Sequence, residues 1–298
     1  MSMDIVLAVI IEGDLMRTFN GKVVAITGAG SGLGRELALQ FSELGAKLSL
    51  CDIDMAALEE TKKLCDKNAS EDIFLSVVDV SDAKQVHDWA DATYEYFNCI
   101  NMIVNNAGVT HTASIQSISY EDFEWLMSIN FWGMIYGTKA FLPYLERSGD
   151  GHVVNVSSVM SIVSYSDLAA YCSSKFAIRG FTESLMQELR IAGSQVGVTC
   201  VMPGGIRTNL MENGRFGDRL TYQLSDEELK KDFKESLAPS SAKSVASKTI
   251  NAVRKKKFRL IIGSDAHIFT FVQKLFPVSY HFIYTLLTRM ALGHSGRG

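Results

Sequence analysis

The chain has 298 residues, of which 47% are hydrophobic and 21% are charged, and its formal net charge is −4. This length and composition indicate a globular protein with a large core, and the absence of concentrated positive charge argues against a nucleic-acid-binding protein. The five cysteines include no CxxC pair, and the six histidines form no ligand motif. We therefore expect a reduced, cytoplasmic protein without a bound metal.

The chain begins with a segment that does not resemble the domain that follows. Residues 1–15 contain one apolar run, 5–11, which is too short to span a bilayer and lacks the basic start and cleavage site of a secretory signal. We predict an N-terminal extension at 1–15 and a catalytic domain at 16–264. Whether the extension is a remnant or a functional arm stays open.

From Lys22 onward, short runs rich in Val, Ile and Leu alternate with longer helical patterns. The predicted strands are 23–27, 47–52, 73–79, 102–105, 151–157, 198–202 and 259–263, and the predicted helices are 35–44, 55–67, 82–96, 120–145, 170–191 and 241–255. Continuous apolar strands are typical of a parallel sheet that is covered on both faces. The alternation predicts an α/β fold: a single doubly wound Rossmann-type domain with helices on both faces of the sheet.

A glycine-rich turn follows the first predicted strand. The usual GxGxxG fingerprint fails, because Leu33 stands where its third glycine would be, and the pattern is instead Thr-Gly-x-x-x-Gly-x-Gly from Thr27. Glycines permit the tight turn and let a pyrophosphate approach the N–H groups that open the next helix. The predicted dinucleotide contacts in this turn are Gly28, Ser31, Gly32, Leu33 and Gly34.

The second predicted strand ends at Asp52, where a carboxylate can accept hydrogen bonds from the adenosine ribose. It would repel a 2′-phosphate, and neither Ser31 nor its neighbour Ile53, also a predicted contact, brings a positive charge. This favours NAD over NADP as the cofactor. Arg35 lies nearby and could alter that preference.

The next two predicted strands also end in residues suited to a dinucleotide. Asp79 and Val80 close the third strand, and Asn106, Ala107 and Gly108 follow the fourth. Because the carboxyl ends of parallel strands meet at one edge, we expect Asp79 near the adenine and the Asn-Ala-Gly turn near the ribose.

Tyr171 and Lys175 lie one helical turn apart, and Ser158 ends the fifth predicted strand. A lysine charge beside the phenol, together with an oxidised nicotinamide, would lower the tyrosine pKa toward the range of general acid–base catalysis. The Ser158 hydroxyl could orient a substrate oxygen, with Ser157 as an alternative. An ordinary Tyr and Lys on an amphipathic helix is the alternative interpretation of the pair.

These motifs resemble the short-chain dehydrogenase/reductase family from about Lys22 to Gly263, in the glycine turn, the Asn-Asn-Ala-Gly element and the Ser, Tyr and Lys set. The resemblance implies that Asn130 supports a proton relay from the lysine. It also implies homodimers or homotetramers built on helices 120–145 and 170–191. The nicotinamide contacts that it implies are Pro203, Gly204, Ile206 and Thr208, with Tyr171 and Lys175 contributing to the cofactor site as well.

Two segments depart from the alternation. The polar stretch 209–240 follows a strand end, and we interpret it as a lid, with a solvated surface excursion as the alternative. The tail at 265–298 carries apolar residues at helical spacing through 268–292, interrupted at Pro277 and accompanied by Lys and Arg. It could pack on its own subunit, cover a partner's active site, or make peripheral contact with a membrane.

The predicted function is an NAD-dependent oxidoreductase that interconverts a secondary alcohol and a ketone. The substrate is expected to be a lipophilic small molecule, because the region around the site is apolar. An NADP-preferring carbonyl reductase and a non-catalytic dinucleotide sensor are the alternatives. The apolar residues expected around the substrate are Val159, Met160, Ile162, Val163, Tyr165, Met202, Leu210 and Met211.

Overall fold

The computed structural model describes residues 18–65, 72–221 and 224–295, so the predicted extension at 1–15 lies outside the described part. Its centre is a seven-stranded sheet, in the order β11-β7-β6-β4-β1-β2-β3, with every neighbouring pair parallel. The predicted doubly wound fold is confirmed. The strands are β1 Val23–Thr27, β2 Lys47–Asp52, β3 Ile73–Val77, β4 Met102–Asn105, β6 His152–Val156, β7 Gly197–Pro203 and β11 Arg259–Ile262.

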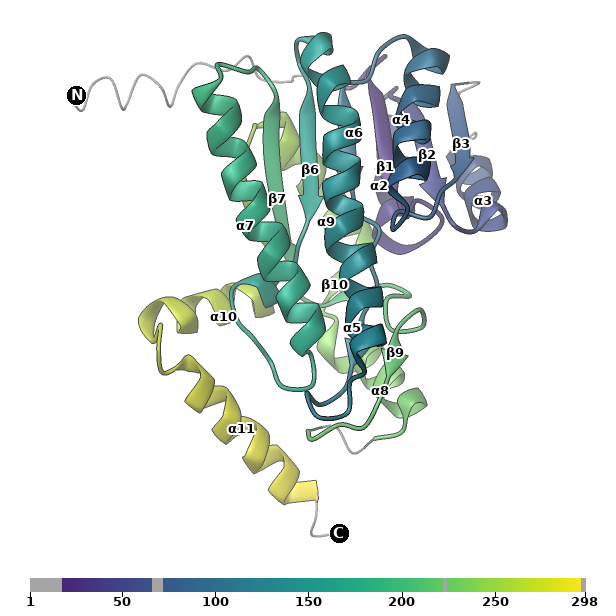
Figure 1. Ribbon diagram of the computed structural model, residues 1–298. Coiled ribbons are helices and arrows are strands. Elements are labelled where there is room, and N and C mark those ends of the chain that lie inside the picture. The colour runs from purple at the N-terminus through teal and green to yellow at the C-terminus, as the bar shows by residue number, and fades with distance from the viewer. Residues whose placement is uncertain (1–17, 66–71, 222–223, 296–298) are drawn as a thin grey trace, which may run out of the picture.

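Helices cover both faces of the sheet, which explains why its strands are apolar throughout (Figure 1). All five residues of β1 are buried. One core joins the sheet to α2 (Gly32–Glu43), α3 (Met55–Cys65) and α9 (Ala242–Arg254). A second core joins the opposite face to α4 (Ala83–Phe97), α6 (Gly133–Ser148) and α7 (Ala169–Ile191).

The predicted helix at 120–145 is observed as three consecutive segments. These are α5 (Tyr120–Met127), a π-helical turn (Ser128–Trp132) and α6. A π turn inserts one residue without interrupting the helical direction, so the apolar periodicity of the sequence does not reveal it. This turn carries Asn130.

The carboxyl ends of the strands carry the additional short elements. β5 (His111–Thr112) pairs with β9 (Arg215–Phe216), and β8 (Ile206–Arg207) pairs with β10 (Ser240–Ser241). A 3₁₀ turn, Val159–Ser161, follows β6. The predicted lid region contains β9, α8 (Asp226–Asp232), a π turn (Phe233–Leu237) and the start of β10.

The predicted C-terminal helical tail consists of α10 (Ser264–Leu275) and α11 (Tyr280–Ser295), and Pro277 lies between them. Figure 1 shows these two helices, in yellow, at the carboxyl edge of the sheet, and α11 contacts the body through the hydrogen bond between Thr288 and Tyr165. Within the described residues, no helix has both the length and the apolar character needed to cross a bilayer.

Candidate active site

A single large cleft of about 1150 Å³ runs along the carboxyl edge of the sheet. It brings together nearly all of the predicted cofactor contacts, from five different strand ends. The lining includes Gly28, Ser31, Gly32, Leu33, Asp52, Ile53, Asp79, Val80, Asn106, Ala107, Gly108, Tyr171, Lys175, Pro203, Gly204, Ile206 and Thr208. Gly34 does not line the cleft and has a packing role beneath the turn.

The glycine turn has the geometry that a dinucleotide pyrophosphate requires. Gly28 and Gly32 have φ values of +65° and +54°, which side chains disfavour. A Cβ at Gly34 would overlap the backbone oxygen of Gly28. The turn leads directly into α2, whose first N–H groups offer an anion site, so these residues fit a dinucleotide cofactor.

Asp52 is held in place at the adenosine end of the cleft. One carboxylate oxygen accepts a hydrogen bond from the Gly30 N–H at 2.9 Å, and the other accepts from the Asp54 N–H at 3.3 Å. The Arg35 guanidinium is engaged by the Gly30 carbonyl and by Glu60, 2.7 Å away. Arg35 is therefore already paired with a carboxylate and is not a free cation for a 2′-phosphate.

Thr27 links the glycine turn to the Asn-Ala-Gly turn. From the sequence it was identified only as the start of the glycine pattern. The Thr27 hydroxyl accepts hydrogen bonds from the N–H groups of Asn106 and Ala107, both at 2.9 Å. The Asn106 side chain donates to the Thr27 carbonyl at 2.9 Å. The glycine turn and the Asn-Ala-Gly turn are thereby fixed to each other.

Ser158, Tyr171 and Lys175 converge on one part of the cleft. The Ser158 hydroxyl, which accepts from the Met160 N–H at 3.1 Å, lies close enough to the Tyr171 phenol to lower its pKa, and the Lys175 ammonium lies 5.5 Å from the centre of the phenol ring. Lys175 is 5% exposed and donates to the Val156 carbonyl at 3.2 Å. The Ser157 hydroxyl donates to the Lys175 carbonyl at 2.9 Å, which leaves Ser158 as the hydroxyl beside the phenol.

Burial is the main influence on the pKa values of Tyr171 and Lys175. It raises the pKa of Tyr171 to about 12, against the lowering effect of the Ser158 hydroxyl, and it lowers the pKa of Lys175 to about 8. The prediction that Lys175 and an oxidised nicotinamide together lower the phenol pKa concerns the protein with its cofactor bound, so it stays a prediction.

Asn130 lies behind the site and does not line the cleft. Its side chain accepts from the Val109 N–H at 2.8 Å and donates to the Val109 carbonyl at 3.0 Å and to the Ser174 hydroxyl at 3.2 Å. The π turn aims this side chain at the loop that follows the Asn-Ala-Gly element.

Apolar side chains surround the catalytic end of the cleft. Of the predicted substrate-side residues, Val159, Met160, Tyr165, Leu210 and Met211 line it. Ile162, Val163 and Met202 do not line the cleft and are buried in a small core beneath it. They belong to the same apolar runs, and the sequence cannot distinguish a core position from a lining one.

Several further lining residues were not predicted from the sequence, among them Trp125, Phe233, Asp265 and Phe269. Trp125 and Phe233 lie in helical segments, and from the sequence an apolar residue there cannot be distinguished from a core residue. Asp265 accepts a hydrogen bond from the Gly205 N–H at 2.8 Å, across 60 positions of sequence. No local pattern indicates such a contact, because it depends on where α10 packs.

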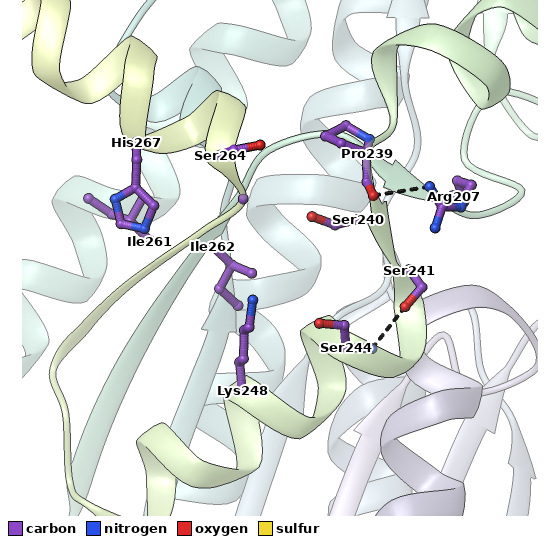
Figure 2. A pocket seen from close by; sticks show the side chains of 11 residues that line it. Arg207, Pro239, Ser240, Ser241, Ser244, Lys248, Ile261, Ile262, Ser264 and His267 are labelled. Atoms are coloured by element: carbon purple, nitrogen blue, oxygen red, sulfur yellow. Dashed lines mark hydrogen bonds between the residues drawn. The ribbon is translucent and has the colours of Figure 1, made fainter.

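A second, polar hollow of about 510 Å³ lies beside β8 and shows how the nicotinamide loop is held. Figure 2 shows Arg207 directed at the Pro239 carbonyl, to which it donates at 3.0 Å, and it also donates to the Ala238 carbonyl at 3.0 Å. Pairing of β8 with β10 adds to this anchor. The next residue along the chain, Thr208, is thereby fixed at the edge of the cleft, against the glycine turn.

Comparison with known proteins identifies the family. The model of the short chain dehydrogenase family matches residues 22–217. The chain belongs to this family. As a short-chain dehydrogenase it is an oxidoreductase.

Curated relatives agree with the assignment to the short-chain dehydrogenases. The chain is 38% identical over 265 residues to "Putative oxidoreductase SadH" of Mycobacterium tuberculosis, covering 89% of this chain and 94% of that protein. It is 36% identical over 200 residues to human "Estradiol 17-beta-dehydrogenase 11", covering 66% of each.

Solved short-chain dehydrogenases share the fold. A short chain dehydrogenase/reductase from Burkholderia phymatum, in complex with NAD, superposes with a TM-score of 0.79 at 29% identity, covering 88% of this chain and 95% of that one. Levodione reductase superposes with a TM-score of 0.74 at 30% identity, covering 84% and 99%. The fold prediction and the family resemblance are both confirmed.

Proposed function

We propose that this short-chain dehydrogenase interconverts a secondary alcohol and a ketone on a lipophilic small molecule, with NAD as its cofactor. The observation that carries the proposal is the convergence of Ser158, Tyr171 and Lys175 at the apolar end of the dinucleotide cleft. The estradiol dehydrogenase among the relatives supports a lipophilic alcohol as the substrate class.

Each residue of the set has a distinct task in alcohol oxidation. Tyr171 accepts the hydroxyl proton while Ser158 holds the substrate oxygen through its hydroxyl. A bound NAD supplies the carbon that takes the hydride and a positive charge beside the phenol. Lys175 binds the ribose and adds its own charge, and Asn130 orders the backbone at Val109, from which a water could relay protons to the lysine.

The proposal is tested by Tyr171→Phe. We expect turnover of an alcohol to fall by about 10²–10⁴-fold, because the acid–base group is lost, while NAD binding measured by calorimetry changes little. In the native enzyme the oxidation rate should rise with pH, because a protonated phenol cannot accept a proton. The same rise should be absent from the residual activity of the variant. Near-native turnover by Tyr171→Phe would refute the assignment.

The preference for NAD over NADP is tested at Asp52. The carboxylate repels a 2′-phosphate, and Arg35 is already paired with Glu60. In Asp52→Asn we expect the ratio of kcat/KM for NAD to that for NADP to fall by about tenfold or more, equivalent to about 1.4 kcal/mol. If the native enzyme uses NADP at least as well, the alternative of an NADP-preferring carbonyl reductase is correct.

We also propose that the enzyme is a homodimer or homotetramer assembled through the outer faces of α5, α6 and α7. Trp132 and Phe176 support this, because they are large apolar side chains that stay 48% and 40% exposed on this layer. The remaining alternative is a dinucleotide sensor without activity. Tight NAD binding with no turnover of any alcohol or ketone would favour it.

A further inference from the structure

The C-terminal tail exposes an apolar surface that no other part of the described ranges covers. We call it the tail face, and it comprises the outward-facing apolar residues of α10, α11 and their connection. Their exposed fractions run from 47% to 73%, values that are unusual for side chains of this size. The residues are Ile268, Phe271, Leu275, Phe276, Val278, Phe282 and Leu286.

The opposite side of the tail is firmly packed, so the tail face cannot simply turn inward. The Tyr284 ring meets the Phe269 ring edge-on at 5.3 Å, and Tyr280 and Tyr284 pack on the core around Ile162 and Val163. The Thr288 hydroxyl forms a hydrogen bond with the Tyr165 hydroxyl at 3.0 Å.

Beyond Asp265, the charged side chains of the tail have one sign. From residue 266 to residue 298 the sequence contains no Asp or Glu. Lys274 precedes Leu275, and Arg289 stands seven positions after Phe282 and three after Leu286, which places it on the same side of α11. Both side chains are exposed, and neither forms an ion pair with any residue of the described ranges.

This combination favours an anionic surface over a second copy of the chain. A two-fold interface would set the tail face against itself and bring Lys274 and Arg289 of one copy near those of the other. At a bilayer surface the same cations meet anionic headgroups while the apolar side chains enter the boundary of the acyl region. Long Lys and Arg side chains reach headgroups easily from such a position.

We propose that the tail face docks on the surface of an anionic lipid bilayer, with α10 and α11 lying along it. At 12 and 16 residues, the two helices suit an interfacial position and do not reach across the hydrocarbon core. On the inner side of the same tail, Phe269 lines the cleft. Tyr165, whose hydroxyl is hydrogen-bonded to Thr288 of the tail, lines the cleft as well. If the proposed function holds, docking would let a lipophilic substrate pass from the bilayer to Ser158 and Tyr171.

The test is co-sedimentation of the full chain with vesicles of phosphatidylcholine and phosphatidylserine, compared with phosphatidylcholine alone. We expect binding to the anionic vesicles that weakens with added salt. In Phe271→Glu/Phe282→Glu the bound fraction should fall by about tenfold. In Lys274→Glu/Arg289→Glu the preference for anionic vesicles should disappear. Ile191→Glu is the matched control, because Ile191 is 87% exposed at the far end of α7, and it should bind as the native protein does.

The failure of this proposal is distinct from the failure of the proposed function. Neither Phe271 nor Phe282 lines the cleft, so turnover of a water-soluble alcohol without vesicles should be equal in the native and double-variant proteins. Absent vesicle binding, or binding that the Phe substitutions leave unchanged, would overturn the proposal. So would light scattering that shows a native dimer converted to a monomer by Phe271→Glu/Phe282→Glu, since the tail face would then be an interface between copies.

Discussion

At the level of single residues, His152 shows how a buried titratable group couples this fold to pH. It lies at the start of β6, 1% exposed, with its Nε2 atom 2.8 Å from the Thr199 hydroxyl. Burial, with a smaller contribution from the Lys256 charge, lowers the pKa of His152 to about 3. The folded protein therefore keeps this ring neutral through the whole range in which an exposed histidine takes up a proton.

The direction of the pH effect follows from that difference. Between about pH 6.5 and pH 3 the unfolded chain binds a proton at His152 that the folded chain does not, so the free energy of unfolding falls as the pH falls. In His152→Gln the loss between about pH 7 and pH 4.5 should be smaller by on the order of 2 kcal/mol. Urea unfolding at the two pH values measures it, and His87→Gln, at an exposed position on α4, should retain the native pH dependence.

At the level of elements, the contact between α6 and β4 depends on a glycine. The Asn105 side chain, at the end of β4, donates to the Thr138 hydroxyl at 3.0 Å and to the Asn155 side chain at 2.8 Å. It occupies the space in which Gly137 has no side chain, and a Cβ there would overlap the Asn105 side-chain oxygen. Close approach of helix and strand thus requires glycine at this position.

Gly137→Ala should consequently destabilise the protein by about 1–3 kcal/mol, despite the better helix propensity of alanine. Because Asn105 precedes the Asn-Ala-Gly turn, the affinity for NAD should decrease as well. Thermal unfolding and calorimetric titration with NAD provide the measurements. Lys139→Ala, at an exposed position of the same helix, should leave both quantities near native, and equal effects of the two substitutions would argue against a steric cause.

The elements also show what can be predicted from a sequence of this kind. The strands could be located closely, β1, β2 and β4 at the predicted bounds, because burial on both faces demands continuous apolar runs. The glycine turn could be located because its φ values and close contacts admit little else. The Tyr and Lys pair was indicated by its helical spacing together with the family resemblance.

What could not be predicted depends on tertiary packing. The π turn that presents Asn130 leaves the apolar periodicity intact, and the contact of Asp265 with Gly205 joins parts of the chain 60 positions apart. Burial raises the pKa of Tyr171, and the depth of a side chain is a property of the folded molecule. The interpretation of 209–240 as a lid stays a prediction, although Leu229 and Phe233 of this segment line the cleft.

At the level of the whole molecule, each helical layer exposes a large apolar side chain at which assembly can be tested. α3 carries Leu64, 39% exposed, on one layer, and α7 carries Phe176, 40% exposed, on the other. If the protein assembles through α5, α6 and α7, Phe176→Glu should lower the mass measured by light scattering, because it places a charge in an apolar contact. Leu64→Glu should not. The same mass for native protein and both variants would contradict assembly through this layer.

The packing of Asp265 limits how far the C-terminus of this enzyme can be truncated. The Asp265 carboxylate fits between Gly204 and Gly263, at either of which a Cβ would overlap it, and it holds the Gly205 N–H at 2.8 Å. A truncation that removes α11 alone would keep the hydrogen bond between Asp265 and Gly205. A truncation before residue 265 would remove it and loosen the segment from Gly205 to Thr208. Trimmed versions for crystallisation or biocatalysis should therefore retain at least the first turn of α10.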